Sequence, residues 1–210
     1  MTQPRLRHLF AATVSALALT LVGCAVPGQE AAPGVAAQYD GRTVTNAHVD
    51  EVYEAWVTDS QGIVVPIQRR SIITIELLGP TLIAESEAQG FLISDSAATD
   101  LAREWISLMG GQGEPSPQTV ESVRAIFALG VLSVLGTEDG NATLTQIAED
   151  VEANAVFSPR SGEFSVDLFL QSVTDATDWA ISQQLGSYFY TAYLDVNGLV
   201  EPASPWIDRG

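Results

Sequence analysis

The sequence contains 210 residues but no lysine, one cysteine and two histidines. All nine basic residues are arginines, set against 26 acidic residues, and the formal net charge is −17 at pH 7. A field of this sign repels phosphate backbones and anionic lipid headgroups, so we expect no nucleic-acid binding and no electrostatic adsorption to membranes. A single cysteine excludes an intrachain disulfide bond, so packing alone has to stabilise the fold.

The scarcity of histidine and cysteine also limits the chemistry that the chain can perform. After residue 23, His48 is the only histidine, and its place at the start of a predicted helix favours a capping or solvated role. Zinc sites need clusters of cysteine and histidine, and nucleophilic catalysis needs a base oriented by a third group. The sequence shows neither pattern, and it has no glycine-rich phosphate loop with a lysine.

Acidic pairs are the one catalytic pattern that is common in the sequence. Glycosidase chemistry requires two carboxylates across a cleft, but at this density of acidic residues adjacent pairs are expected by chance. The pairs are Glu85 with Glu87, Glu138 with Asp139, Asp150 with Glu152, and Asp175 with Asp178. We therefore predict that the protein is not an enzyme and that it holds no cofactor and no metal ion.

An apolar run from Leu9 to Val22 follows Arg5 and Arg7. It is too short for a spanning helix, which needs about 20 apolar residues. Basic residues, an apolar stretch and a small residue in this order are typical of a secretory signal peptide, which we place at residues 1–23. The segment Leu21-Val22-Gly23-Cys24 resembles the lipobox of bacterial lipoproteins.

The lipobox resemblance implies cleavage before Cys24, lipidation of its thiol by fatty acyl chains such as palmitate, and attachment to the extracytoplasmic face of the cell membrane. The only cysteine is then used by the anchor. Plain secretion without a lipid is the alternative interpretation of the same segment.

Residues 24–36 contain two Pro-Gly pairs and no apolar period, so we predict a flexible tether after Cys24. A linker of this length spans roughly 20 Å. Residues 37–210 are predicted to fold as one mainly α-helical domain, because 46% of the sequence is hydrophobic and apolar residues recur at helical spacing. The segment 165–193 looks like an insertion within this domain.

Turn and capping residues predict the boundaries of the elements. Asp40-Gly41 between short β-prone segments predicts a hairpin, because both turn positions favour positive φ. Thr45 or Asn46 is suited to cap a helix that ends at Asp59. Further helices are predicted at residues 67–89, 94–109, 117–135, 143–154 and 173–188, and a strand and turn at 155–164.

Three of these helices carry more specific predictions. Gly79-Pro80 is predicted to kink the 67–89 helix or break it in two. The stretch 126–135 is apolar nearly all round, which predicts a helix in the centre of the core. In the 94–109 helix, Leu101, Trp105 and Leu108 are predicted to face inward.

Aromatic residues are concentrated late in the chain, at Phe164, Phe169, Tyr188, Phe189, Tyr190 and Tyr193. They are compatible with an exposed surface that binds unfolded polypeptides and also with ordinary packing in the core and at its rim.

Four segments resemble the SurA N-terminal domain family of bacterial chaperones, in a form similar to actinobacterial lipoproteins. They are Tyr39–Thr45 followed by Asp50, Gly90–Asp95, Ser158–Phe164 and Pro205–Ile207. The resemblance covers about residues 37–165 and the last few residues. Three positions depart from the family pattern: Asp40 replaces asparagine, Ser158 replaces asparagine and Ser161 replaces tyrosine.

The resemblance implies a helical domain whose first strand pairs with a late strand near Val156 and which cradles apolar segments of unfolded polypeptides. Many relatives also carry a parvulin prolyl isomerase domain, which uses paired histidines that this chain lacks. The expected function is a non-catalytic, chaperone-like lipoprotein for exported polypeptides. A solute-binding or transporter-accessory lipoprotein is the alternative, although such proteins usually have two α/β lobes.

Overall fold

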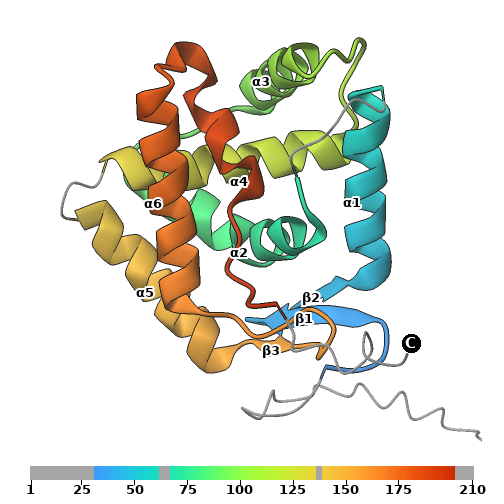
Figure 1. Cartoon of the computed structure of the whole chain (residues 1–210), viewed down its shortest axis with the longest axis vertical. Helices are drawn as coiled ribbons and strands as arrows, with labels where there is room; N and C mark the ends of the chain where they lie inside the picture. Colours follow the sequence, from blue (N-terminus) through green and yellow to red (C-terminus); the bar gives the residue numbers. More distant parts are fainter. Residues whose placement is uncertain (1–30, 62–66, 136–138, 202–210) are drawn as a thin grey trace, which may run out of the picture.

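A computed structural model describes residues 31–61, 67–135 and 139–201. This part of the chain is mainly helical, with a small three-stranded antiparallel sheet at one end, as predicted (Figure 1). The described elements are β1 (Val35–Tyr39), β2 (Arg42–Thr45), α1 (Asn46–Asp59), α2 (Arg69–Ala88), α3 (Asp95–Leu108), α4 (Pro117–Leu135), α5 (Asp139–Asn154), β3 (Val156–Phe157), α6 (Val166–Ser182) and the 3₁₀ helix η1 (Gly186–Asp195).

The predicted hairpin is present, and its turn has the expected geometry. Asp40 and Gly41 have φ values of +46° and +73°, and Tyr39 pairs with Arg42 across a two-residue loop. β1 also pairs with β3, and the sheet order is β2-β1-β3. The pairing of the first strand with a late strand near Val156 is therefore confirmed.

The start of β1 differs from the prediction. The strand begins at Val35, within the segment assigned to the tether. Ala36 is fully buried, and its carbonyl accepts a hydrogen bond from Ser158 at 3.0 Å. Val35 pairs with Thr45 of β2, so β1 begins two residues earlier than the Pro-Gly pattern suggested. Cys24 and the rest of the predicted tether before residue 31 lie outside the described residues.

Helix α2 passes through Gly79-Pro80 as a single element, so the predicted break into two helices is wrong, while the alternative of a kink stays a prediction. Pro80 has no amide proton for the carbonyl of Glu76, one turn earlier. That carbonyl accepts a hydrogen bond from the guanidinium of Arg42 at 3.4 Å instead. Gly79 allows α4 to approach closely, since an added Cβ would lie 3.0 Å from the Cβ of Ala125. A partner from β2 thus offsets part of the cost of the proline.

Helix α4 is central, as its uniform apolar character predicted. It contacts α1, α2, α3, α5, α6 and η1, and it crosses the middle of the molecule in Figure 1. Val123, Ile126, Leu129 and Leu132 are fully buried along it. Residues 122–132 of α4 are buried or half-buried, so this stretch of the helix needs no polar face.

The end of the described chain differs most from the prediction of one helix over 173–188. Helix α6 begins seven residues earlier, where the Ser165 side chain accepts a hydrogen bond from the amide of Leu168 at 3.3 Å. It ends at Ser182, and Gly186, with a φ of +57°, starts η1. Phe169 and Tyr193 are fully buried, so the segment 165–193 supplies part of the same core.

Candidate functional site

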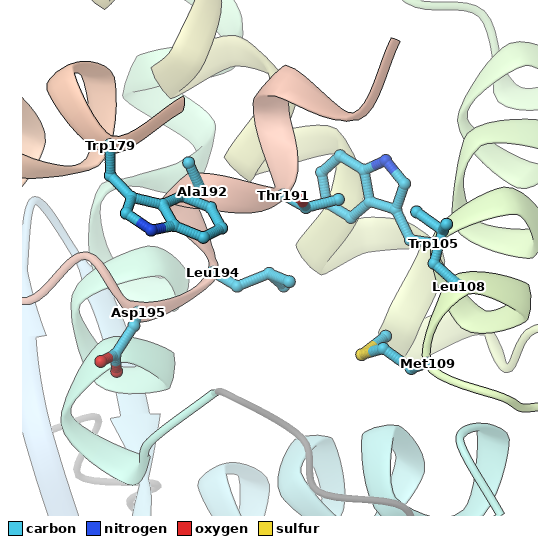
Figure 2. Close-up of a pocket in the computed structure, with 8 residues that line it drawn as sticks. All are labelled: Trp105, Leu108, Met109, Trp179, Thr191, Ala192, Leu194 and Asp195. Carbon is cyan, nitrogen blue, oxygen red and sulfur yellow. The ribbon is translucent and has the colours of Figure 1, made fainter. Parts of the chain in front are cut away.

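An apolar pocket of about 300 Å³ lies between the end of α3 and the pair α6 and η1. Its lining residues are Trp105, Leu108, Met109, Trp179, Thr191, Ala192, Leu194 and Asp195. Figure 2 shows Trp105, Leu108 and Met109 on one side and Trp179, Ala192 and Asp195 on the other. A pocket of this size is at the lower end of the range for small-molecule sites and has room for one or two large side chains.

Helix α3 supplies one wall of the pocket. The Ser94 side chain caps the helix by accepting a hydrogen bond from the amide of Ala97 at 3.2 Å. Ala102, Trp105 and Ile106 are buried, while Leu108 is 48% exposed. The prediction that Leu108 faces inward is therefore wrong. α3 packs mainly on α4, which covers only one stripe of the helix, and Leu108 lies beyond the edge of that stripe.

The opposite wall combines an exposed and a buried aromatic residue. Trp179 on α6 is 51% exposed, although large apolar side chains usually bury most of their surface. Tyr193 of η1 is fully buried, and its hydroxyl connects η1 to α4 and α6. The Tyr193 hydroxyl lies 2.6 Å from Ser133 Oγ on α4 and 2.8 Å from Thr177 Oγ1 on α6. Burial raises the pKa of Tyr193 above its ordinary value, against the opposite effect of these two hydrogen bonds.

Among the described residues that line the pocket, Asp195 is the only ionisable one. Its carboxylate accepts hydrogen bonds from Ser71 Oγ at 3.1 Å and from Gln68 Nε2 at 3.2 Å. The residue as a whole is exposed, yet partial burial of the carboxyl group raises its pKa, against the opposite effect of these two donors. Asp195 therefore lies at the edge of an otherwise apolar pocket, with its carboxylate hydrogen-bonded to the start of α2 (Figure 2).

The residues that the sequence singled out lie elsewhere. Cys24 is outside the described residues, so the lipidation site stays a prediction. The amide of His48 donates to the Thr45 side chain at 3.1 Å, in the first turn of α1. Its Nε2 lies 2.8 Å from a carboxylate oxygen of Glu76 on α2. This contact joins two helices at the surface, and no pocket residue is part of it.

The acidic pairs have ordinary structural surroundings where they are described. Asp150 accepts a hydrogen bond from the Tyr39 hydroxyl, and Glu152 accepts one from the amide of Val166 at 3.0 Å. Within residues 31–61, 67–135 and 139–201, no group of three potential metal ligands comes together. In the same ranges, no helix combines the length and the apolar character that crossing a membrane would demand.

The late aromatic residues pack mostly in the core. Phe164, Phe169 and Tyr193 are buried, whereas Tyr188 is 36% exposed. The rings of Phe189 and Tyr190 are 5.6 Å apart and partly buried against the core. Of the two interpretations, packing in the core and at its rim therefore agrees with the structure.

Searches of protein-family models, curated protein sequences and solved structures found no match to this chain. The candidate site consequently depends on the geometry of the chain itself. Sequence reasoning identified Trp105 only as a core residue and gave no role to Trp179 or Asp195. One signal for Trp179 was available in the sequence. Trp179 follows Asp178 on the polar side of a predicted helix, where a large apolar residue is unexpected.

Proposed function

We propose that this chain is a lipoprotein, anchored through Cys24 to the extracytoplasmic face of the cell membrane, whose helical domain binds apolar segments of unfolded or exported polypeptides without catalysing a reaction. The observation that carries the proposal is the pocket between α3 and η1, with Leu108 and Trp179 half-exposed at its rim. Large apolar groups grouped around a cavity in this way are typical of surfaces that bind a partner.

The size of the pocket defines what kind of binding is proposed. About 300 Å³ accommodates one or two large side chains and not an extended stretch of polypeptide. Binding would therefore depend on a single anchoring residue of the client, with weaker contacts around it. Such binding is transient and tolerant of sequence, as a protein that holds many different clients requires.

The proposed anchor and the negative charge of the chain are compatible. Acyl chains contribute about 0.8 kcal/mol per buried methylene, so lipidation holds a protein to a membrane without help from basic residues. An acidic domain is repelled by anionic headgroups and would stand away from them, with its pocket accessible to polypeptides.

The test of binding compares two leucines that are both exposed. Leu108 lies at the rim of the pocket, while Leu92 is 71% exposed between α2 and α3 and does not line it. The full chain is added at stoichiometric amounts to an unfolded client, and light scattering reports aggregation. We expect Leu108→Ser to lose most of the suppression and Leu92→Ser to retain it.

Equal suppression by the two variants would contradict a role for the pocket. An absence of suppression by the unmodified chain, together with tight binding of a small solute, would replace the proposal by solute binding. The anchor is tested separately by following Cys24→Ala in fractionated cells. We expect the variant to leave the membrane fraction, and unchanged partitioning would refute lipidation.

A further inference from the structure

We infer that the pocket selects apolar segments that carry a lysine or arginine next to the anchoring side chain, with Asp195 binding the positive charge. This inference depends on the proposed function, because it specifies which polypeptide segments the same pocket prefers. It is carried by the chemistry of the lining and by the absence of a cationic partner for Asp195 in the described part of the chain.

The pocket has two chemically different sides. Trp105, Leu108 and Met109 form an apolar side in which an aliphatic or aromatic side chain avoids water (Figure 2). On the other side, Trp179 contributes an indole ring, and Asp195 places a carboxylate at the edge of the pocket. Indole faces attract cations, and a carboxylate does so more strongly. A ligand that matches both sides has an apolar end and a positively charged end.

Asp195 retains acceptor capacity for such a ligand. An ionised carboxylate offers about four lone-pair sites, and within the described part of the chain two donors, Ser71 and Gln68, occupy them. Both donors are neutral, so the negative charge itself is not balanced. In the described ranges no arginine or histidine forms an ion pair with Asp195.

The nearest arginines along α2 are already paired elsewhere. Arg69 forms an ion pair with Asp50 on α1, and Arg70 forms one with Glu201 at 3.0 Å. The rest of the chain adds to the negative potential, since acidic residues outnumber basic ones 26 to nine. The potential around the pocket therefore favours a cationic segment and disfavours an acidic one.

The test uses three capped nine-residue peptides with one central leucine, flanked on both sides by lysine, glutamine or glutamate in an otherwise glycine-serine sequence. Calorimetric titration into the full chain at low salt gives their dissociation constants. We expect the lysine peptide to bind about five-fold more tightly than the glutamine peptide, and the glutamate peptide to bind most weakly. We also expect 0.5 M salt to remove most of this preference.

Two substitutions locate the preference. Asp195→Asn is expected to give the lysine and glutamine peptides equal affinities while changing the glutamine affinity by less than about two-fold. Asp178→Asn is the matched control, since Asp178 is exposed next to Trp179 on α6 but does not line the pocket. We expect this variant to keep most of the five-fold preference, which distinguishes a specific contact from general attraction.

The outcomes separate this inference from the function on which it depends. Equal binding of all three peptides by the unmodified chain, lost in Leu108→Ser, would overturn the charge preference and support the apolar pocket. A preference that survives in Asp195→Asn, or that resists salt, would also overturn the inference. If none of the peptides binds, both the inference and the proposed function fail.

Discussion

The Tyr193 hydroxyl joins η1 to α4 and α6. The loss of unfolding free energy on removing this hydroxyl can be derived by counting the protons available for its hydrogen bonds. Tyr193 Oη contacts the hydroxyls of Ser133 and Thr177, and these also contact the carbonyls of Gly130 at 2.8 Å and Val173 at 2.9 Å. Each of the three hydroxyls carries one proton. Only three of these four contacts are therefore hydrogen bonds at any moment.

In Tyr193→Phe, the hydroxyls of Ser133 and Thr177 still donate to their backbone carbonyls, so no buried donor loses its acceptor. One hydrogen bond is lost in total, which corresponds to about 1 kcal/mol of unfolding free energy. For a domain of this size, such a loss lowers the melting temperature by about 2–4 °C. The expected effect is thus modest, although the side chain is fully buried.

Urea titration followed by tryptophan fluorescence measures the loss, provided that the slope with denaturant is unchanged. Tyr188→Phe is the control, because the same atom is removed from an exposed tyrosine on the same helix and little change is expected. A loss above about 3 kcal/mol for Tyr193→Phe would mean that a buried group is left without a partner. No loss at all would mean that the three-helix junction is not formed. Either result refutes the conclusion that Tyr193→Phe loses one hydrogen bond in total.

Three further predictions concern contacts that join elements distant in sequence. Tyr39→Phe removes the bond donated to Asp150, and we expect urea unfolding to show a loss of about 1.5–3 kcal/mol at pH 7. Burial and this carboxylate raise the pKa of Tyr39, so its stabilising contribution is complete below about pH 10 and is lost as the pH rises further. The difference in unfolding free energy between Tyr39→Phe and the unmodified chain should therefore become smaller above pH 10. A larger difference would contradict the hydrogen bond from Tyr39 to Asp150. Gly111→Ala would place a Cβ 2.1 Å from the carbonyl oxygen of Asp59. Calorimetry should therefore show a loss of about 1–3 kcal/mol of unfolding free energy. An unchanged melting temperature would disprove the close contact. Asp59→Ala removes an acceptor 2.9 Å from both the amide and the hydroxyl of Ser116 at the start of α4. We expect urea unfolding to show a loss of about 1–2 kcal/mol of unfolding free energy. An unchanged unfolding free energy would show that the contact does not stabilise the helix.

Local signals were sufficient to predict most of the elements. Asp40-Gly41 specified the hairpin, Thr45 and Ser94 specified helix starts, and Gly90 specified the end of α2, because each effect acts within a few residues. At Gly90, with a φ of +90°, the following amide of Phe91 bonds back to the carbonyl of Ser86. The central position of α4 was also predictable, since a helix that is apolar on all sides has to be surrounded.

Predictions failed where a partner distant in sequence decided the outcome. α2 is continuous through Pro80 with Arg42 as a partner for the freed carbonyl. β1 is longer than expected because Val35 pairs with Thr45 and the Ala36 carbonyl accepts a hydrogen bond from Ser158. Leu108 is exposed because α3 packs mainly on one helix, α4. None of these effects can be obtained from the spacing of residues in the sequence.

The sequence by itself determined the mainly helical class, the hairpin, the central helix and the strongly acidic character of the protein, because these depend on composition and on neighbours along the chain. It also motivates the lipid anchor at Cys24. Only the tertiary structure brought Trp105, Trp179 and Asp195 together, from segments that are separated by up to 90 residues. A pocket is a property of surfaces left uncovered after packing, and which surfaces remain uncovered depends on how the helices pack in three dimensions.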